Sequence, residues 1–554
     1  MSLTYQNPVY EYARSPDQGA AQAVHHRVIV VGAGPIGMGA ALDLGLHGVE
    51  TLVLDDNNTV SVGSRAICFS KRALEVLDRL GCGERMVDKG VTWNVGKVFF
   101  RDELVTRFDL LPEPGHKMPA FINLQQYYLE EYMVERLNEF DNIELRWNNK
   151  VIAVDDSAEQ TRVSVETPDG AYDMTCDWLI VADGANSDLR AMLGLESTGK
   201  VFEDRFLIAD IVMKADFPPE RWFNFDPSYH RGQSTLLHRQ ADNVWRLDFQ
   251  LGWDKDPNEE KKPENIIPRV RAMLGDDVEF ELEWASVYTF QCRRMPRFRK
   301  GSVLFTGDAA HQVSPFGARG ANSGIQDTDN LAWKLKLVMD GKAPSRLLDS
   351  YCEERELAAD ENIMNSTRST DFITPKSNTS RQFRDATLEL SKRFDFAREL
   401  TNSGRLSDTT VLNDSSLNSP DDGEFDSLLV AGAVMADAPV KGGSTDWLLN
   451  AFGNRFQVIL YIDDIDAFER TTLDALRAMQ DDAIPVETVV VYRSGESPAG
   501  IDALCDVKGM IAARYDARDG SAYLIRPDQH IAARMRAAGV DKIRQAVARA
   551  TAQQ

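Results

Sequence analysis

The feature that most constrains this fold is a glycine-rich turn near the N-terminus, Gly32-Ala33-Gly34-Pro35-Ile36-Gly37. It follows a short apolar segment at residues 28–31 and opens a helical pattern at 35–47. A second apolar strand is expected at 51–54. The order strand, turn, helix, strand is the start of a parallel α/β sheet.

The same turn predicts a dinucleotide site. Gly32 permits the tight bend, Gly34 lets a pyrophosphate approach the backbone, and Gly37 allows helix and strand to pack closely. The helix N-terminus then offers free N–H groups and a partial positive charge to the diphosphate. Asp55 ends the second strand, where a carboxylate accepts hydrogen bonds from ribose hydroxyls. An acid there favours FAD or NAD over NADP.

Length and charge narrow the class of protein. A chain of 554 residues predicts three to four domains, and a formal net charge of −24 argues against nucleic acid or a membrane surface as a partner. The N-terminus lacks the apolar core of a signal peptide, and the most apolar run is too short and glycine-rich to span a membrane. Six scattered cysteines without a C-x-x-C pair favour neither a metal site nor disulfides. We therefore expect a cytoplasmic protein with no metal.

The pattern of apolar and polar residues changes along the chain and indicates separate domains. Residues 244–251 alternate apolar and polar, which predicts a half-buried strand in a mostly antiparallel sheet. An apolar run at 302–306 predicts another strand of the parallel sheet, and a helical pattern follows at 322–339. Residues 406–426 hold six acids and no Lys or Arg, so we interpret them as a solvated linker or long surface loop.

The predicted units are an N-terminal arm (1–26), a nucleotide-binding domain in two parts (27–198 and 301–405, the second with helices), an inserted sheet (199–300), the acidic linker (406–426) and a C-terminal α/β domain (427–554).

Two further motifs give the family. Residues 176–190 read as a strand ending in Asp183-Gly184 with Arg190 after it, and residues 301–311 run into Gly307-Asp308. With the glycine-rich turn, they resemble the three fingerprints of the flavin-dependent aromatic hydroxylases, which are single-component FAD monooxygenases of the 4-hydroxybenzoate and phenol hydroxylase type. The resemblance covers residues 27–370, and more loosely the C-terminal part. Its most specific run is Pro315-Phe316-Gly317-Ala318-Arg319-Gly320-Ala321-Asn322-Ser323-Gly324-Ile325-Gln326-Asp327.

This resemblance implies tightly bound, non-covalent FAD. Asp308 is expected to bind the ribityl chain, and the turn before the 322–339 helix is expected to point amides at the pyrimidine edge of the flavin, where reduced flavin is negative. Arg65 matches an arginine on the adenosine side, and Gln126 a glutamine near the flavin. The residues expected at FAD are Gly32, Ala33, Gly34, Pro35, Ile36, Gly37, Asp55, Arg65, Gln126, Val151, Asp183, Arg190, Asp308, Gly320, Ala321 and Asn322.

The resemblance also implies a reaction. NAD(P)H reduces the flavin from a transient site, since no second G-x-G-x-x-G occurs; O2 then forms a C4a-hydroperoxyflavin, which hydroxylates a phenolic ring. Pro315 is expected beside the small aromatic substrate, and Leu247 and Phe249 are predicted to line its pocket. No motif fixes the catalytic base; His238, Arg239 and Tyr229 are the candidates.

The C-terminal domain resembles the thioredoxin-like domain of the larger family members, on the strand and R-P-D element at 523–530. Its Cys505 has no C-x-x-C partner, which argues against disulfide exchange and leaves a structural or dimer-supporting role, with a homodimer open. The expected fold is α/β: a Rossmann-like FAD-binding domain, an inserted mostly antiparallel substrate sheet and a thioredoxin-like domain. Two alternatives stay open: a same-fold monooxygenase of a non-phenolic substrate such as an antibiotic, and a flavin-binding redox or interaction protein without turnover.

Overall fold

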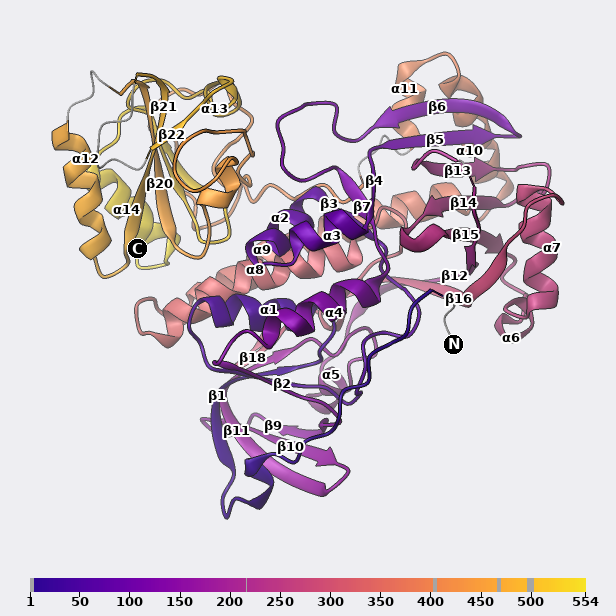
Figure 1. The fold of residues 1–554 in the computed structure, drawn as a ribbon, viewed down its shortest axis with the longest axis horizontal. Coiled ribbons are helices and arrows are strands. Elements are labelled where there is room, and N and C mark those ends of the chain that lie inside the picture. The colour runs from indigo at the N-terminus through magenta and orange to yellow at the C-terminus, as the bar shows by residue number, and fades with distance from the viewer. Residues whose placement is uncertain (1–3, 216, 402–405, 466–469, 496–502) are drawn as a thin grey trace.

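The structure is a computed structural model that describes residues 4–215, 217–401, 406–465, 470–495 and 503–554. It places the C-terminal domain on one side, an eight-stranded sheet on the other, and a nucleotide-binding sheet with long helices between them (Figure 1). Within these residues, no helix has both the length and the apolar character needed to cross a membrane.

The first sheet has a parallel core built from the predicted strands. β1 pairs in parallel with both β2 and β11, and β11 pairs in parallel with β18, so segments far apart in sequence share one edge. Where these strands pair, at residues 28–31, 51–54, 179–181 and 303–305, the side chains are buried and nearly all apolar, as a sheet covered on both faces requires. The strand order is β17 (Arg299–Lys300), β18 (Val303–Phe305), β11 (Gly170–Val181), β1 (Val24–Val31), β2 (Thr51–Leu54) and β8 (Ile143–Arg146), with the antiparallel β9 (Lys150–Asp155) and β10 (Thr161–Thr167) joined to β11.

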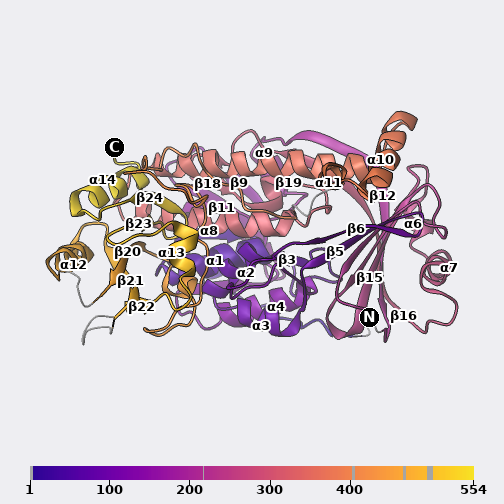
Figure 2. The same cartoon turned by 90° about the horizontal axis from the view of Figure 1, so that it is seen from above.

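Helices of both parts of the nucleotide-binding domain pack around this sheet. α1 contacts both α4 and α8, and the long α9 lies along α8 (Figure 2). The helices are α1 (Pro35–Leu46), α2 (Lys71–Arg79), α3 (Gly83–Lys89), α4 (Gln126–Leu137), α5 (Asp188–Met192), α8 (Gly320–Met339) and α9 (Leu347–Ile373). A small sheet of β3 (Cys68–Ser70), β7 (Phe121–Asn123) and β4 (Val91–Trp93) adjoins them.

The second sheet is mostly antiparallel, with one parallel pair between β13 and β5. It reaches outside the inserted region, because β5 and β6 come from the first part of the chain and β19 from after the insertion. Its order is β19 (His311–Gln312), β16 (Glu281–Arg294), β12 (Thr198–Val212), β15 (Val244–Leu251), β14 (Ser234–Arg239), β13 (Arg221–Phe225), β5 (Val95–Phe100) and β6 (Glu103–Asp109). The nearby helices are α6 (Pro257–Glu260), α7 (Pro263–Leu274), α10 (Asn378–Ser391) and α11 (Asp395–Leu400).

The C-terminal domain is a five-stranded mixed sheet. β20 pairs in parallel with β21 and antiparallel with β23, which forms a hairpin with β24. The strands are β22 (Ala503–Cys505), β21 (Val486–Ser494), β20 (Phe456–Asp464), β23 (Ala522–Ile525) and β24 (Ile531–Met535), and the helices α12 (Arg470–Arg477), α13 (Met510–Tyr515) and α14 (Val540–Ala550). This β-α-β unit followed by a β-hairpin and a helix is the arrangement of a thioredoxin-like core.

The acidic segment at 406–426 has the form of a long surface loop, one of the two forms predicted; it has no helix or strand, but it is bound to the C-terminal sheet and is not a free linker. Its apolar side chains Leu406, Leu412 and Leu417 are buried, and backbone hydrogen bonds join it to β24. Asp421 and Asp422 form ion pairs with Arg534 and Lys542. Composition is a poor guide here because these cations come from more than a hundred residues further along the chain. The last four residues before it, 402–405, lie outside the described residues.

Candidate functional site

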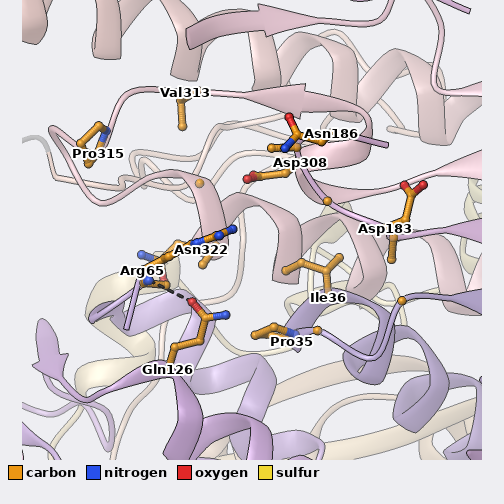
Figure 3. A pocket seen from close by; sticks show the side chains of 18 of the residues that line it. Pro35, Ile36, Arg65, Gln126, Asp183, Asn186, Asp308, Val313, Pro315 and Asn322 are labelled. Atoms are coloured by element: carbon orange, nitrogen blue, oxygen red, sulfur yellow. Dashed lines mark hydrogen bonds between the residues drawn. The ribbon is translucent and has the colours of Figure 1, made fainter. Parts of the chain in front are cut away.

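A single cavity of about 700 Å³ runs from the glycine-rich turn to the second sheet. Figure 3 shows its middle, where Pro35 and Ile36 face Asp308 and Asn186, and Pro315 and Val313 lie further along. Two sheets and the N-terminus of α8 meet here. The site is therefore assembled from residues that span most of the first 322 positions.

The glycine-rich turn has the geometry that a phosphate cradle needs. Gly32 has a φ of +105°, and a Cβ there would lie 2.5 Å from the Ala182 carbonyl oxygen. A Cβ on Gly37 would lie 1.9 Å from the Gly32 carbonyl oxygen, so Gly37 serves packing and does not line the cavity. At Gly34 a Cβ would meet nothing within 4 Å, which leaves open space at the start of α1.

The carboxylates of Asp55 and Asp183 line the nucleotide end of the cavity. Asp55 lines it and accepts hydrogen bonds from the backbone N–H groups of Ala33, at 2.6 Å, and Asn57, at 2.8 Å. Ala33 itself does not line the cavity; its amide fixes Asp55. Burial raises the pKa of both Asp55 and Asp183. Asp183 Oδ1 is buried without a hydrogen-bond partner among the described residues.

Two other predicted FAD residues are placed differently from each other. Val151 lines the cavity at the nucleotide end. Arg190 does not line it; its Nη1 donates to the Ala309 carbonyl at 2.8 Å and its Nη2 to the Ala185 carbonyl at 3.3 Å. Arg190 therefore ties the turn after β11 to the turn that carries Asp308.

Asp308 lies where the two halves of the cavity meet. Its side chain is open to the cavity, although protein surrounds it, and this burial raises its pKa. No hydrogen bond to its carboxylate forms among the described residues, so its oxygens can accept from ligand hydroxyls. Gly320, Ala321 and Asn322, at the N-terminus of α8, line the same region, where a helix carries partial positive charge.

Arg65 and Gln126 lie side by side and both line the cavity (Figure 3). Gln126 Oε1 accepts a hydrogen bond from the Ala66 N–H at 3.0 Å, and its Nε2 donates to Glu130 at 2.7 Å. The segment that carries Arg65 is thereby fixed to α4. Pro315 lines the cavity toward the second sheet.

The second sheet turns one face toward the cavity and the other toward α7. The register puts alternate residues of β12, β14, β15 and β16 on the cavity side. Those that line the cavity are Phe206, Ile208, Arg221, Leu236, His238, Arg246, Asp248, Tyr288 and Phe290. The substrate end is thus an aromatic and apolar wall that carries a few polar groups.

The predicted pocket residues Leu247 and Phe249 are wrong. They lie on the opposite face, buried in the apolar cluster that includes Ile266 and Val270 of α7. Residues 244–251 do form a strand with two distinct faces, but its polar face, with Arg246 and Asp248, lines the cavity. The apolar side of this strand packs against α7 as part of the core, and apolar residues of the neighbouring strands β12, β14 and β16 line the cavity instead.

Of the three candidate bases, only His238 lines the cavity. Tyr229 hydrogen-bonds Thr235 at 2.8 Å, and the Arg239 guanidinium lies 5.7 Å from the Trp245 ring centre; neither lines the cavity. His238 is 2% exposed, and its Nε2 lies 3.4 Å from Asp248 Oδ2. Burial, with help from Arg221, lowers the pKa of His238 to about 4.

Sequence reasoning missed Arg221, Arg246, Asp248 and Tyr288. The signal for Arg246 and Asp248 was available, because they alternate with the apolar residues of the same strand. Arg221 carried no signal, since nothing in the sequence shows that β13 pairs with β14.

The cavity fits FAD. The cavity offers three features that the diphosphate, ribose and ribityl chain of FAD require. These are the open space at Gly34, the Asp183 Oδ1 that lacks a hydrogen-bond partner, and the Asp308 carboxylate that lines the cavity. FAD contacts at individual residues remain predictions.

Comparisons with known proteins also indicate an FAD-binding protein. The FAD binding domain family matches residues 25–366, and the HcaD C-terminal domain family matches 437–550. The chain is 25% identical over 526 residues, 92% of each chain, to a 3-(3-hydroxy-phenyl)propionate/3-hydroxycinnamic acid hydroxylase of Escherichia coli O81. It is 26% identical to a hydroxylase of the same description from Mycolicibacterium smegmatis, over 65% of this chain and 63% of that protein.

Solved structures share the fold. The flavin-dependent monooxygenase PieE, in complex with FAD and substrate, superposes with a TM-score of 0.79 at 21% identity over 96% of this chain and all of its own. Aklavinone-11 hydroxylase, with FAD and aklavinone, gives 0.74 at 20% identity over 96% of this chain and all of its own. With a family match over more than half of its length, the chain belongs to the FAD binding domain family and is an FAD-dependent aromatic hydroxylase.

Proposed function

We propose that this protein hydroxylates a phenolic compound with NAD(P)H and O2. The observation that carries the proposal is the single cavity, which joins a dinucleotide-binding turn to a face of aromatic and titratable side chains. The two hydroxylases named above act on 3-(3-hydroxyphenyl)propionate, a phenol, and this supports the same class here. FAD, when bound, supplies electron transfer from NAD(P)H and the activation of O2.

The chain's own residues then have three tasks. The glycine-rich turn, Asp308 and the α8 N-terminus hold the cofactor and favour negative charge on the flavin ring. Phe206, Tyr288 and Phe290 line the sheet end and keep water from the reacting ring. The third task is to accept the phenol proton, because ionisation makes the ring a better nucleophile.

We assign that third task to the pair His238 and Asp248. Asp183 and Asp55 lie at the nucleotide end, and burial raises the pKa of Tyr288, which keeps its hydroxyl protonated. His238 and Asp248 lie on the sheet face itself, and the lowered pKa of His238 leaves its ring neutral near pH 7. His238 Nε2 has no hydrogen-bond partner among the described residues, so it can accept the phenol proton, and Asp248 Oδ2 lies 3.4 Å away to stabilise the charge that results.

A panel of phenols, hydroxybenzoates and hydroxyphenylpropionates tests the function. The FAD-loaded enzyme should oxidise NADH or NADPH faster when its substrate is added, consume O2, and form a hydroxylated product. Stimulation by non-phenolic compounds alone would favour the alternative monooxygenase. A yellow protein that no member of the panel stimulates would be a flavin-binding protein without this activity.

A further inference from the structure

An unpaired buried charge lies at the substrate end of the cavity. Arg221, the first residue of β13, is 4% exposed and lines the cavity. Its Nε and Nη1 have no hydrogen-bond partner, and its guanidinium forms no ion pair with any residue that the structure describes. Its close neighbours are rings: the guanidinium lies 4.9 Å from the Phe223 ring centre and 6.0 Å from that of Trp93.

A second arginine on the same sheet face provides the contrast. Arg246 is also buried, but its Nε and Nη2 each donate to Asp210 at 2.8 Å. Its Nη2 also donates to the Ser64 carbonyl. The charge of Arg246 is thus balanced within the protein, whereas that of Arg221 is not. Burying an unpaired charge is strongly unfavourable, so a protein keeps one where a ligand completes the pair.

The position of Arg221 relates it to the proton-accepting pair. β13 and β14 pair Trp222 with Leu237, so the next step of the register places Arg221 opposite His238. Residues opposite each other in an antiparallel pair have Cβ atoms about 5 Å apart. Arg221 lowers the pKa of His238, and Asp248 interacts favourably with Arg221 without forming an ion pair with it. An anion bound at Arg221 would offset this effect on His238.

We propose that Arg221 binds an anionic oxygen group of the substrate, and that this group is a carboxylate carried by the phenol. A guanidinium donates two parallel hydrogen bonds to a carboxylate, and a carboxylate is ionised throughout the working pH range. The phenolate oxygen is the other possible source of the charge. The inference rests on the proposed function in taking the sheet end of the cavity as the substrate side.

A ligand titration of the FAD-loaded enzyme tests the role of Arg221 without turnover. The change in flavin absorbance reports binding. The probes are 3-phenylpropionate, its neutral amide and 4-nitrophenol. Wild type should bind the carboxylate more tightly than the amide, and Arg221→Met should raise the Kd of the carboxylate about 10- to 100-fold while that of the amide stays within about threefold. Arg221→Lys should retain part of the affinity. Arg239→Met, which removes a charge outside the cavity, should change neither Kd.

A second measurement guards against misfolding. If its charge is unpaired, Arg221→Met should keep its FAD and melt no lower than wild type without ligand, but should lose the rise in melting temperature that 3-phenylpropionate gives to wild type. A rise in the apparent pKa of bound 4-nitrophenol in Arg221→Met, with no preference for carboxylate over amide, would assign the anion as phenolate. Equal weakening of all three probes, or none, would overturn the proposal. Failure of the proposed function would instead appear as absent NAD(P)H oxidation with every phenol, whatever these binding constants are.

Discussion

Asp327 of α8 accepts a hydrogen bond from the backbone N–H of Gly307, with 3.0 Å between Oδ2 and the amide nitrogen. Gly307 has a φ of +56° and directly precedes Asp308. Asp327 also bonds His311 and Arg355, each at 2.7 Å. Burial opposes its ionisation, but the interactions with His311 and Arg355 lower the pKa of Asp327 below its usual value. A carboxylate outside the cavity thus fixes the turn that presents Asp308 to it.

Asp327→Ala should destabilise the protein by about 3–5 kcal/mol, because it leaves the buried Arg355 without its partner. The measurement is urea unfolding with FAD content. Asp340→Ala, just after the end of the same helix and in an exposed pair with Lys336, should lower the free energy of unfolding by less than about 1 kcal/mol. Similar losses for the two variants would contradict the role given to Asp327.

Asp308→Ala should purify with little or no FAD, since the carboxylate is placed to bind ligand hydroxyls and makes no hydrogen bond within the described residues. The apoprotein should melt no lower than wild-type apoprotein, because the carboxylate that is removed has a raised pKa and makes no hydrogen bond among the described residues. The ratio of flavin to protein absorbance measures the first effect. Full FAD retention would argue that Asp308 does not hold the cofactor.

Two glycines of the same turn should respond differently to alanine. Gly37→Ala should not yield folded protein, because its Cβ would lie 1.9 Å from a backbone oxygen. Gly34→Ala should fold, since its Cβ meets no protein atom within 4 Å, but should bind FAD more weakly. Circular dichroism and FAD titration separate the two effects. Tight FAD binding by Gly34→Ala would place the diphosphate elsewhere.

The C-terminal domain should be firmly attached to the rest of the protein. Arg526 Nη1 and Nη2 donate to the two oxygens of Glu354 on α9, at 2.7 and 2.9 Å, and both residues are buried. Arg526→Met should lower the free energy of unfolding by about 3–5 kcal/mol, because the buried Glu354 loses an ion-pair partner. Arg544→Met, in an exposed pair with Asp482 of the same domain, is the control and should cost less than about 1 kcal/mol in urea unfolding.

His238→Gln should lower kcat/KM for the phenolic substrate about 10²- to 10⁴-fold at pH 7. Because burial and Arg221 lower the pKa of His238 to about 4, the wild-type ring is neutral above that pH, so kcat/KM should fall only as the pH approaches about 4. The deficit of the variant should shrink toward about pH 10, where a phenol ionises by itself. A deficit that is constant across this pH range would indicate a packing role for His238.

The sequence by itself determined the nucleotide half of the site. Local signals suffice there, because the turn at Gly32–Gly37 and the strands at 28–31 and 51–54 depend on backbone conformation and on apolar runs within a few residues. The turn at Asp308 was placed by resemblance to a family whose motifs are also contiguous in sequence.

Only the tertiary structure decided the substrate half. Alternation shows that a strand has two faces, but not which face meets α7 and which meets the cavity, and this is why Leu247 and Phe249 were misassigned. Arg221 became informative once β13 and β14 were paired and its charge was seen to lack a partner. Pairing, burial and charge balance arise between residues far apart in the chain, so no local pattern encodes them.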